Sequence, residues 1–178
     1  MTTEDDALDR LLAAGARIDA PSTPYGTGPD HVHETYGPVA ARTLVVVHGG
    51  YFRPGVDLTH ARPMARALAD LGWRVVLAEY RRVPGDPDAT LEDLQRLDEH
   101  LRRTGHDVAA WVGHSAGGAL VMWRALHPDL PPVRVLALAP VADFDAAVTD
   151  RLGGDAVRGA VEAQLVVADA DPDRCGRS

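Results

Sequence analysis

The sequence has almost no cysteine, no lysine and no long apolar run, and each absence argues against a class of protein. It contains one cysteine, Cys175, and therefore cannot form an internal disulfide. Lysine is absent, so all 18 basic residues are arginine, and they are outnumbered by 26 acidic residues. The arginines form no basic run in the sequence, which argues against nucleic acid or an anionic membrane as partner. No apolar run approaches the roughly 18 residues of a membrane span. The acidic start at Met1–Asp6 is unlike a secretory signal, so we expect a cytoplasmic protein.

Length and composition indicate one globular domain over residues 1–178. The apolar content of 46% and the charged content of 25% are ordinary values for a folded chain. Residues 1–30 are expected to form an N-terminal helix, over 3–14, followed by a loop, over 21–30. Neither an internal repeat nor a low-complexity segment is visible.

Beyond residue 40, apolar β-branched runs alternate with segments of helical periodicity. The expected strands are 42–48, 74–80, 108–112 and 133–139, and the expected helices are 63–71, 90–103 and 116–126. This alternation predicts an α/β fold, in which helices cover both faces of a mainly parallel sheet. Ligands of such sheets bind beyond the carboxyl ends of the strands, so the loops after these strands are the place for a site.

One of these loops carries a serine between glycines. It reads Gly113-His114-Ser115-Ala116-Gly117-Gly118, directly after an apolar strand and directly before an apolar helix. Gly-x-Ser-x-Gly alone is weak evidence, but the strand–turn–helix setting is the one in which a nucleophilic serine is held exposed on a strained turn. A glycine-rich phosphate loop is the alternative, and it lacks both the Gly-x-Gly-x-x-Gly spacing and a following lysine. We therefore interpret Ser115 as a nucleophile.

A second loop can supply hydrogen-bond donors to an oxyanion. His48-Gly49-Gly50-Tyr51 ends the first strong strand, and the backbone N–H groups of such a loop can point at a developing negative charge. The amide of Ala116, at the start of the helix after the serine, is expected to be the other source.

In four motifs the sequence resembles the α/β-hydrolases, on the esterase branch near the arylformamidases (kynurenine formamidases) and the hormone-sensitive-lipase-like carboxylesterases. The motifs are 48–51 (HGGY), 72–82 (GWRVVLAEYRR), 113–118 (GHSAGG) and 138–143 (LAPVAD), and their order and spacing match over residues 24–155. The resemblance implies a serine hydrolase that uses Ser115 as nucleophile and Gly50, Tyr51 and Ala116 as oxyanion donors, with no cofactor and no metal. Its substrate would be a small carboxylic ester or an aryl formamide. Phe52 stands where the arylformamidase pattern usually has tryptophan, which leaves the choice of substrate open.

The residues that should activate the serine are largely missing. In the family the order is serine, acid, histidine, yet no histidine follows His127. His127 itself ends the helix that begins at the serine, some 18 Å away at about 1.5 Å per residue. The acid is expected after the next strand, where Asp169 or Asp171 is a candidate; a solvated acidic tail is the alternative. Asp143 is expected instead to shape the pocket or to cap a helix.

We therefore interpret the chain as a truncated α/β-hydrolase with impaired activity, and keep a non-catalytic pseudoenzyme or fragment as the alternative. Residues 141–162 are a candidate lid region, because this superfamily inserts lids there. An unpaired apolar sheet edge would favour a homodimer or aggregation. His31 and His33, at i and i+2, could ligate a metal, but a surface edge strand is the preferred interpretation since no third ligand is near in sequence.

Overall fold

The structure, a computed structural model, describes residues 3–83 and 86–150. Its centre is a sheet in the order β1-β2-β4-β3-β5-β6, parallel from β4 to β6, with β2 antiparallel to both β1 and β4. The strands are β1 (Ser22–Pro24), β2 (Val32–Tyr36), β3 (Thr43–Val47), β4 (Arg74–Ala78), β5 (Val108–His114) and β6 (Val135–Leu138). The helices are α1 (Thr3–Gly15), the 3₁₀ helix η1 (Leu58–Ala61), α2 (Arg62–Asp70), α3 (Pro87–Arg103), α4 (Ala116–Leu126) and α5 (Phe144–Thr149). The expected α/β fold is confirmed.

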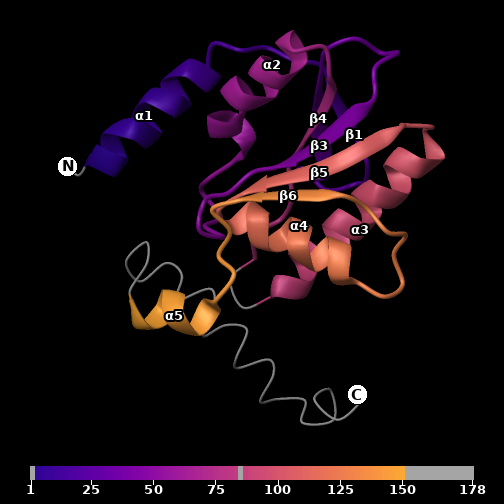
Figure 1. Ribbon diagram of the computed structural model, residues 1–178. Coiled ribbons are helices and arrows are strands. Elements are labelled where there is room, and N and C mark those ends of the chain that lie inside the picture. The colour runs from indigo at the N-terminus through magenta and orange to yellow at the C-terminus, as the bar shows by residue number, and fades with distance from the viewer. Residues whose placement is uncertain (1–2, 84–85, 151–178) are drawn as a thin grey trace.

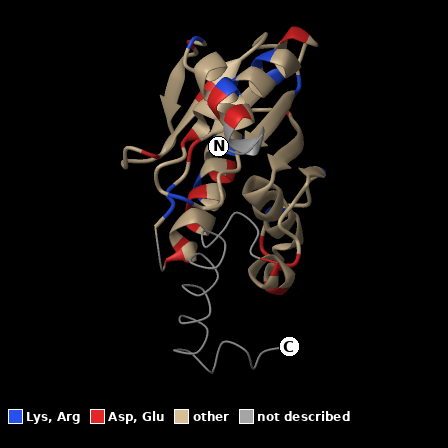
Figure 2. Cartoon of the chain, turned by 90° about the vertical axis from the view of Figure 1, so that its left-hand side faces the viewer, with Lys and Arg blue, Asp and Glu red and all other residues tan. Residues whose placement is uncertain are grey.

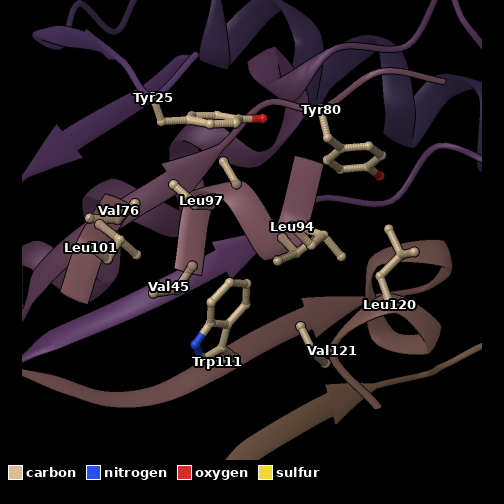
Figure 3. Close-up of a cluster of buried hydrophobic side chains, with 12 residues drawn as sticks. Tyr25, Val45, Val76, Tyr80, Leu94, Leu97, Leu101, Trp111, Leu120 and Val121 are labelled. Atoms are coloured by element: carbon tan, nitrogen blue, oxygen red, sulfur yellow. The ribbon is translucent and has the colours of Figure 1, made fainter. Parts of the chain in front are cut away.

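The two faces of the sheet are covered by different helices, with α1 and α2 on one side and α3 and α4 on the other (Figure 1). Because side chains alternate along a strand, Val45 and Val47 of β3 pack toward α3 and α4, whereas Leu44 and Val46 pack toward η1 and α2. Figure 3 shows the larger cluster, in which Trp111 of β5 lies beneath the leucines of α3. Burial on both faces explains why these strands are continuous apolar runs.

Polar side chains set the starts of two helices. Asp86 accepts a hydrogen bond from Ala89 N (3.2 Å) at the start of α3, where Pro87 occupies the first helical position. Asp143 accepts one from Ala146 N (2.8 Å) and begins α5. The helix-capping interpretation of Asp143 is therefore confirmed.

The N-terminal side of the sheet differs from the prediction. The expected loop at 21–30 contains the short strand β1, and β2 lies between β1 and β4 rather than at the edge. His31 and His33 are therefore buried, with exposed fractions of 7% and 2%, and the surface interpretation was wrong. Residues distant in the sequence cover these polar side chains: Asp93 Oδ1 lies 2.9 Å from His31 Nε2, and Arg62 Nε donates to Glu34 of β2 (3.0 Å).

His33 packs against two more histidines, one of them on α3. Its ring centre lies 5.5 Å from that of His100, on α3, and 6.5 Å from that of His106, in the turn before β5. Burial and the neighbouring histidines lower the pKa of His33 to about 4, and burial also lowers the pKa of His100 and His106. All three rings are therefore neutral at pH 7. In the described ranges, 3–83 and 86–150, no group of three or more His, Cys, Asp or Glu residues is arranged to hold a metal ion.

We expect this cluster to make the fold acid-sensitive. A histidine whose pKa is lower in the folded than in the unfolded chain gives stability at neutral pH, and that stability is lost as the pH falls from about 6.5 toward 4. For His33 the loss is roughly 3 kcal/mol. Urea unfolding at several pH values should show it in the wild type and show less of it in His33→Gln. The control His127→Gln alters a partly exposed ring and should keep the full pH dependence; an equal slope in all three proteins would contradict the prediction.

Positively and negatively charged residues are interspersed over the folded chain (Figure 2). In Figure 2 the arginines are scattered among aspartates and glutamates and form no basic stripe. The ion pairs of α3 are an example, since Arg102 pairs with Asp98 one turn away. No helix in the described part of the chain is long and apolar enough to cross a bilayer.

Candidate active site

Ser115 lies on the tight turn that joins β5 to α4. Its backbone has φ 53° and ψ −119°, a left-handed conformation that non-glycine residues rarely adopt. The turn is held by backbone hydrogen bonds to β6 and to the loop after it, from Ser115 N to Leu138 O (2.9 Å) and from Val141 N to Ser115 O (3.3 Å). The side chain makes no capping hydrogen bond to its own helix. Ser115 therefore lies at the carboxyl edge of the sheet, partly exposed and without a capping bond that would occupy its hydroxyl.

The glycines around Ser115 allow the turn to pack. A Cβ on Gly113 would lie 2.1 Å from Gly117 O, and one on Gly117 would lie 2.2 Å from Val47 O. Gly118 is similarly close to Pro140, at 2.9 Å. Strand β5, helix α4 and the end of β3 can approach this closely only because these positions have no side chain.

The His48–Tyr51 segment passes directly beside the serine. A Cβ on Gly49 would lie 3.1 Å from Ser115 Cβ and 2.8 Å from His114 O, so only a glycine fits between β3 and the serine turn. The backbone then turns through three residues with positive φ: Gly50 (123°), Tyr51 (55°) and Phe52 (56°). Two consecutive non-glycine residues in this region are unusual, and such strain persists only where surrounding contacts impose it.

An apolar cluster covers the same loop from the other side. Ala147 of α5 is 1% exposed and packs with Tyr51, Val141, Phe144 and Val148. The rings of Phe52 and Phe144 lie 6.4 Å apart. The described part of the candidate lid region therefore contacts the loop beside Ser115; residues 151–162 of that region lie outside the described residues.

All eight histidines lie in the described part of the chain, and five of them have partners away from the serine turn. His31 contacts Asp93 of α3, His33 packs against His100 and His106, and His127 Nε2 lies 3.2 Å from the amide of Gln95 at the far end of α4. Two others have backbone partners, since His48 Nδ1 lies 2.7 Å from Gly49 O and His60 Nδ1 lies 2.9 Å from Asp57 O. His114 is exposed and precedes the serine. Within the described residues, none of these rings is hydrogen-bonded to Ser115 Oγ.

The other predicted site residues divide between the described and masked parts of the chain. The structure brings Ser115, Ala116 and the Gly50–Tyr51 segment to the same edge of the sheet. The two acid candidates, Asp169 and Asp171, lie outside the described residues. Glu79 is not among the predicted site residues; it is a buried carboxylate whose oxygens lie 3.1 Å from His48 Nε2 and accept a hydrogen bond from Leu58 N (2.9 Å).

Fold and site together define a class of protein: a mainly parallel α/β sheet with a strained serine turn after β5 and a Gly-Gly loop after β3. The chain belongs to the alpha/beta hydrolase family, whose pattern matches residues 44–174.

Three similar proteins give this assignment its context. A probable carboxylic ester hydrolase of Mycobacterium tuberculosis, LipM, is 34% identical over 98 residues, which are 51% of this chain and 23% of that protein. Esterase B of Lactobacillus rhamnosis has a similar fold, with a TM-score of 0.66 and 21% identity over 98% of this chain and 70% of that one. An esterase of the bacterial hormone-sensitive lipase family matches with a TM-score of 0.58 and 24% identity, over 94% of this chain and 62% of that one. The chain thus spans less than a quarter of the curated relative.

Proposed function

We propose that this chain is a serine hydrolase of carboxylic esters or of an aryl formamide, with Ser115 as the nucleophile and no cofactor or metal. The observation that carries the proposal is the strained Ser115 backbone, which holds the hydroxyl beside the Gly49–Tyr51 segment. In the reaction, Oγ would attack the carbonyl carbon, and the alcohol or amine would leave with a proton. Water would then release the acid from the acyl-serine.

The N–H groups of Gly50, Tyr51 and Ala116 are the proposed donors to the oxyanion. Ala116 is the first residue of α4, and the free N–H groups of a helix start carry partial positive charge. Asp171 or Asp169 is the proposed acid. The cluster of Tyr51, Val141, Phe144 and Val148 would form an apolar wall for the acyl or leaving group, with 141–162 as a lid. The relatives that are described as esterases support a small-molecule ester as substrate.

A second candidate is a non-catalytic pseudoenzyme or fragment, and the absence of a histidine bonded to Ser115 in the described residues favours it. In either case a homodimer is proposed through β6, the edge strand of the sheet within the described residues, where Val135 and Leu136 are 36% and 53% exposed.

Labelling with a fluorophosphonate separates the two candidates. We expect one slow adduct on the 19.0 kDa chain, seen by intact mass and abolished in Ser115→Ala. The reagent forms a bond from phosphorus to Oγ and releases fluoride, so an adduct reports a reactive serine. No adduct after prolonged exposure would favour the non-catalytic candidate. An adduct that persists in Ser115→Ala would assign the reactivity to another residue.

A further inference from the structure

The loop beside Ser115 needs outside support. It runs from His48, at the end of β3, to Leu58, at the start of η1, and we refer to it as the 48–58 loop. Its turns hold it locally, through hydrogen bonds from Arg53 N to Gly50 O (3.0 Å) and from Val56 N to Arg53 O (3.1 Å). Neither bond fixes the loop relative to the sheet. Tyr51 and Phe52 pack against α5, and the attachment of the two ends decides how the strained segment 50–52 lies relative to β3 and β5.

One buried carboxylate bonds to both ends. Glu79, the residue after β4, is 6% exposed. Its Oε1 lies 3.1 Å from His48 Nε2 at the first end, and its Oε2 accepts a hydrogen bond from Leu58 N (2.9 Å) at the second. The carboxylate thus joins β4 to both ends of the loop.

His48 has contacts through both ring nitrogens, through its ring face and through its backbone carbonyl. Its Nδ1 lies 2.7 Å from Gly49 O, so the ring connects the carboxylate to the first backbone carbonyl of the Gly-Gly segment. The ring stacks on that of Tyr80 at 4.6 Å between centres, and the Tyr80 hydroxyl donates to His48 O (2.7 Å). His48 and Tyr80 are both fully buried. The ring and the backbone carbonyl of His48 are therefore each held by a separate contact.

Glu79 remains ionised in this setting. Burial alone would raise its pKa, but hydrogen bonding and charge from His48 and Arg82 outweigh burial and lower the pKa to about 2. Arg82 Nη1 donates to Glu79 Oε1, and Tyr80 N donates to the same oxygen (2.9 Å). An ionised carboxylate offers lone pairs to all these donors, whereas an amide of the same shape has only one accepting atom.

We infer that Glu79 is a positioning residue, whose carboxylate fixes both ends of the 48–58 loop so that the N–H groups of Gly50 and Tyr51 face Ser115. The link to catalysis rests on the proposed function; the link to loop geometry does not. Glu79 does not touch the reacting atoms and acts through His48 and Leu58.

Two readouts on Glu79→Gln test the inference. The first is amide hydrogen exchange, in which residues 49–57 should exchange roughly tenfold faster or more while β3 and β5 keep their protection. The second is the rate of fluorophosphonate labelling at Ser115, which should fall by roughly ten- to a hundredfold because displaced donors stabilise the oxyanion less. Glu79→Asp keeps the charge but is too short to bond to both ends, so it should fold and show the same changes to a smaller degree.

The matched control is Asp98→Asn. Asp98 is also buried, at 4% exposed, and its Oδ1 accepts from Arg124 Nη2 (3.0 Å), but it joins α3 to α4 and has no bond to the loop. This variant should leave loop exchange and labelling rate unchanged. Exchange that rises equally in the loop and in β3–β5 of Glu79→Gln would mean a general structural role and would overturn the inference, as would unchanged loop exchange. A wild-type chain that takes no label would refute the proposed function, and the exchange measurement would still decide the role of Glu79.

Discussion

Replacing Gly117 with alanine is expected to lower the free energy of unfolding by about 3 kcal/mol, despite the better helix propensity of alanine. The new Cβ would lie 2.2 Å from Val47 O and 2.5 Å from His48 O. Both contacts are with backbone atoms at the end of the central strand β3, which cannot move aside as a flexible side chain could. Helix α4 would have to retreat from β3 by about an ångström, and close-packed interiors resist such shifts.

Gly55→Ala is the matched control, because a Cβ there meets nothing within 4 Å. Urea unfolding of both variants and the wild type measures the difference. We expect Gly55→Ala to stay within about 0.5 kcal/mol of the wild type. Equal midpoints for Gly117→Ala and Gly55→Ala would show that β3 and α4 do not approach as closely as described. Since the same retreat moves Ser115, the labelling rate of Gly117→Ala should fall as well.

The serine turn could be predicted because its signals are local. An apolar strand, a Gly-x-Ser-x-Gly turn and an apolar helix follow one another directly, and the steric need for small residues at 113 and 117 arises within the same few residues. The helix predicted at 116–126 has the observed bounds for the same reason. The parallel core strands were also predictable, since burial on both faces leaves an uninterrupted apolar run.

The environment of Glu79 could not be predicted in this way. Its partners His48 and Leu58 lie 31 and 21 residues away along the chain, and the segment around it looks like an ordinary strand end. The surface prediction for His33 was wrong for a related reason. A polar residue in a strand points to solvent only where no element distant in the sequence covers it. Here His100 of α3 and His106 of the turn before β5 cover His33.

Ester hydrolysis by this chain is expected to be roughly 10⁴- to 10⁶-fold slower than by a relative with a complete triad, because no histidine of the described residues is bonded to Ser115 to take its proton. A general base must come within hydrogen-bond reach of the hydroxyl. His48 is committed to Gly49 and Glu79, and His60 Nδ1 is committed to the carbonyl of Asp57. The residual rate would come from the oxyanion donors and from substrate binding.

Turnover of an activated ester measures this effect, with Ser115→Ala as the background and a complete relative under the same conditions as the reference. A rate near the typical enzyme value of about 10 s⁻¹ would contradict the prediction. The base would then be found by testing His114→Ala and His60→Ala. These are the two candidates because His114 directly precedes Ser115, and the ring of His60 lies 5.5 Å from that of His48, at the start of the Gly-Gly loop. A loss confined to one variant would identify the base, whereas a slow rate in every variant would agree with a nucleophile that retains its strained turn without a base.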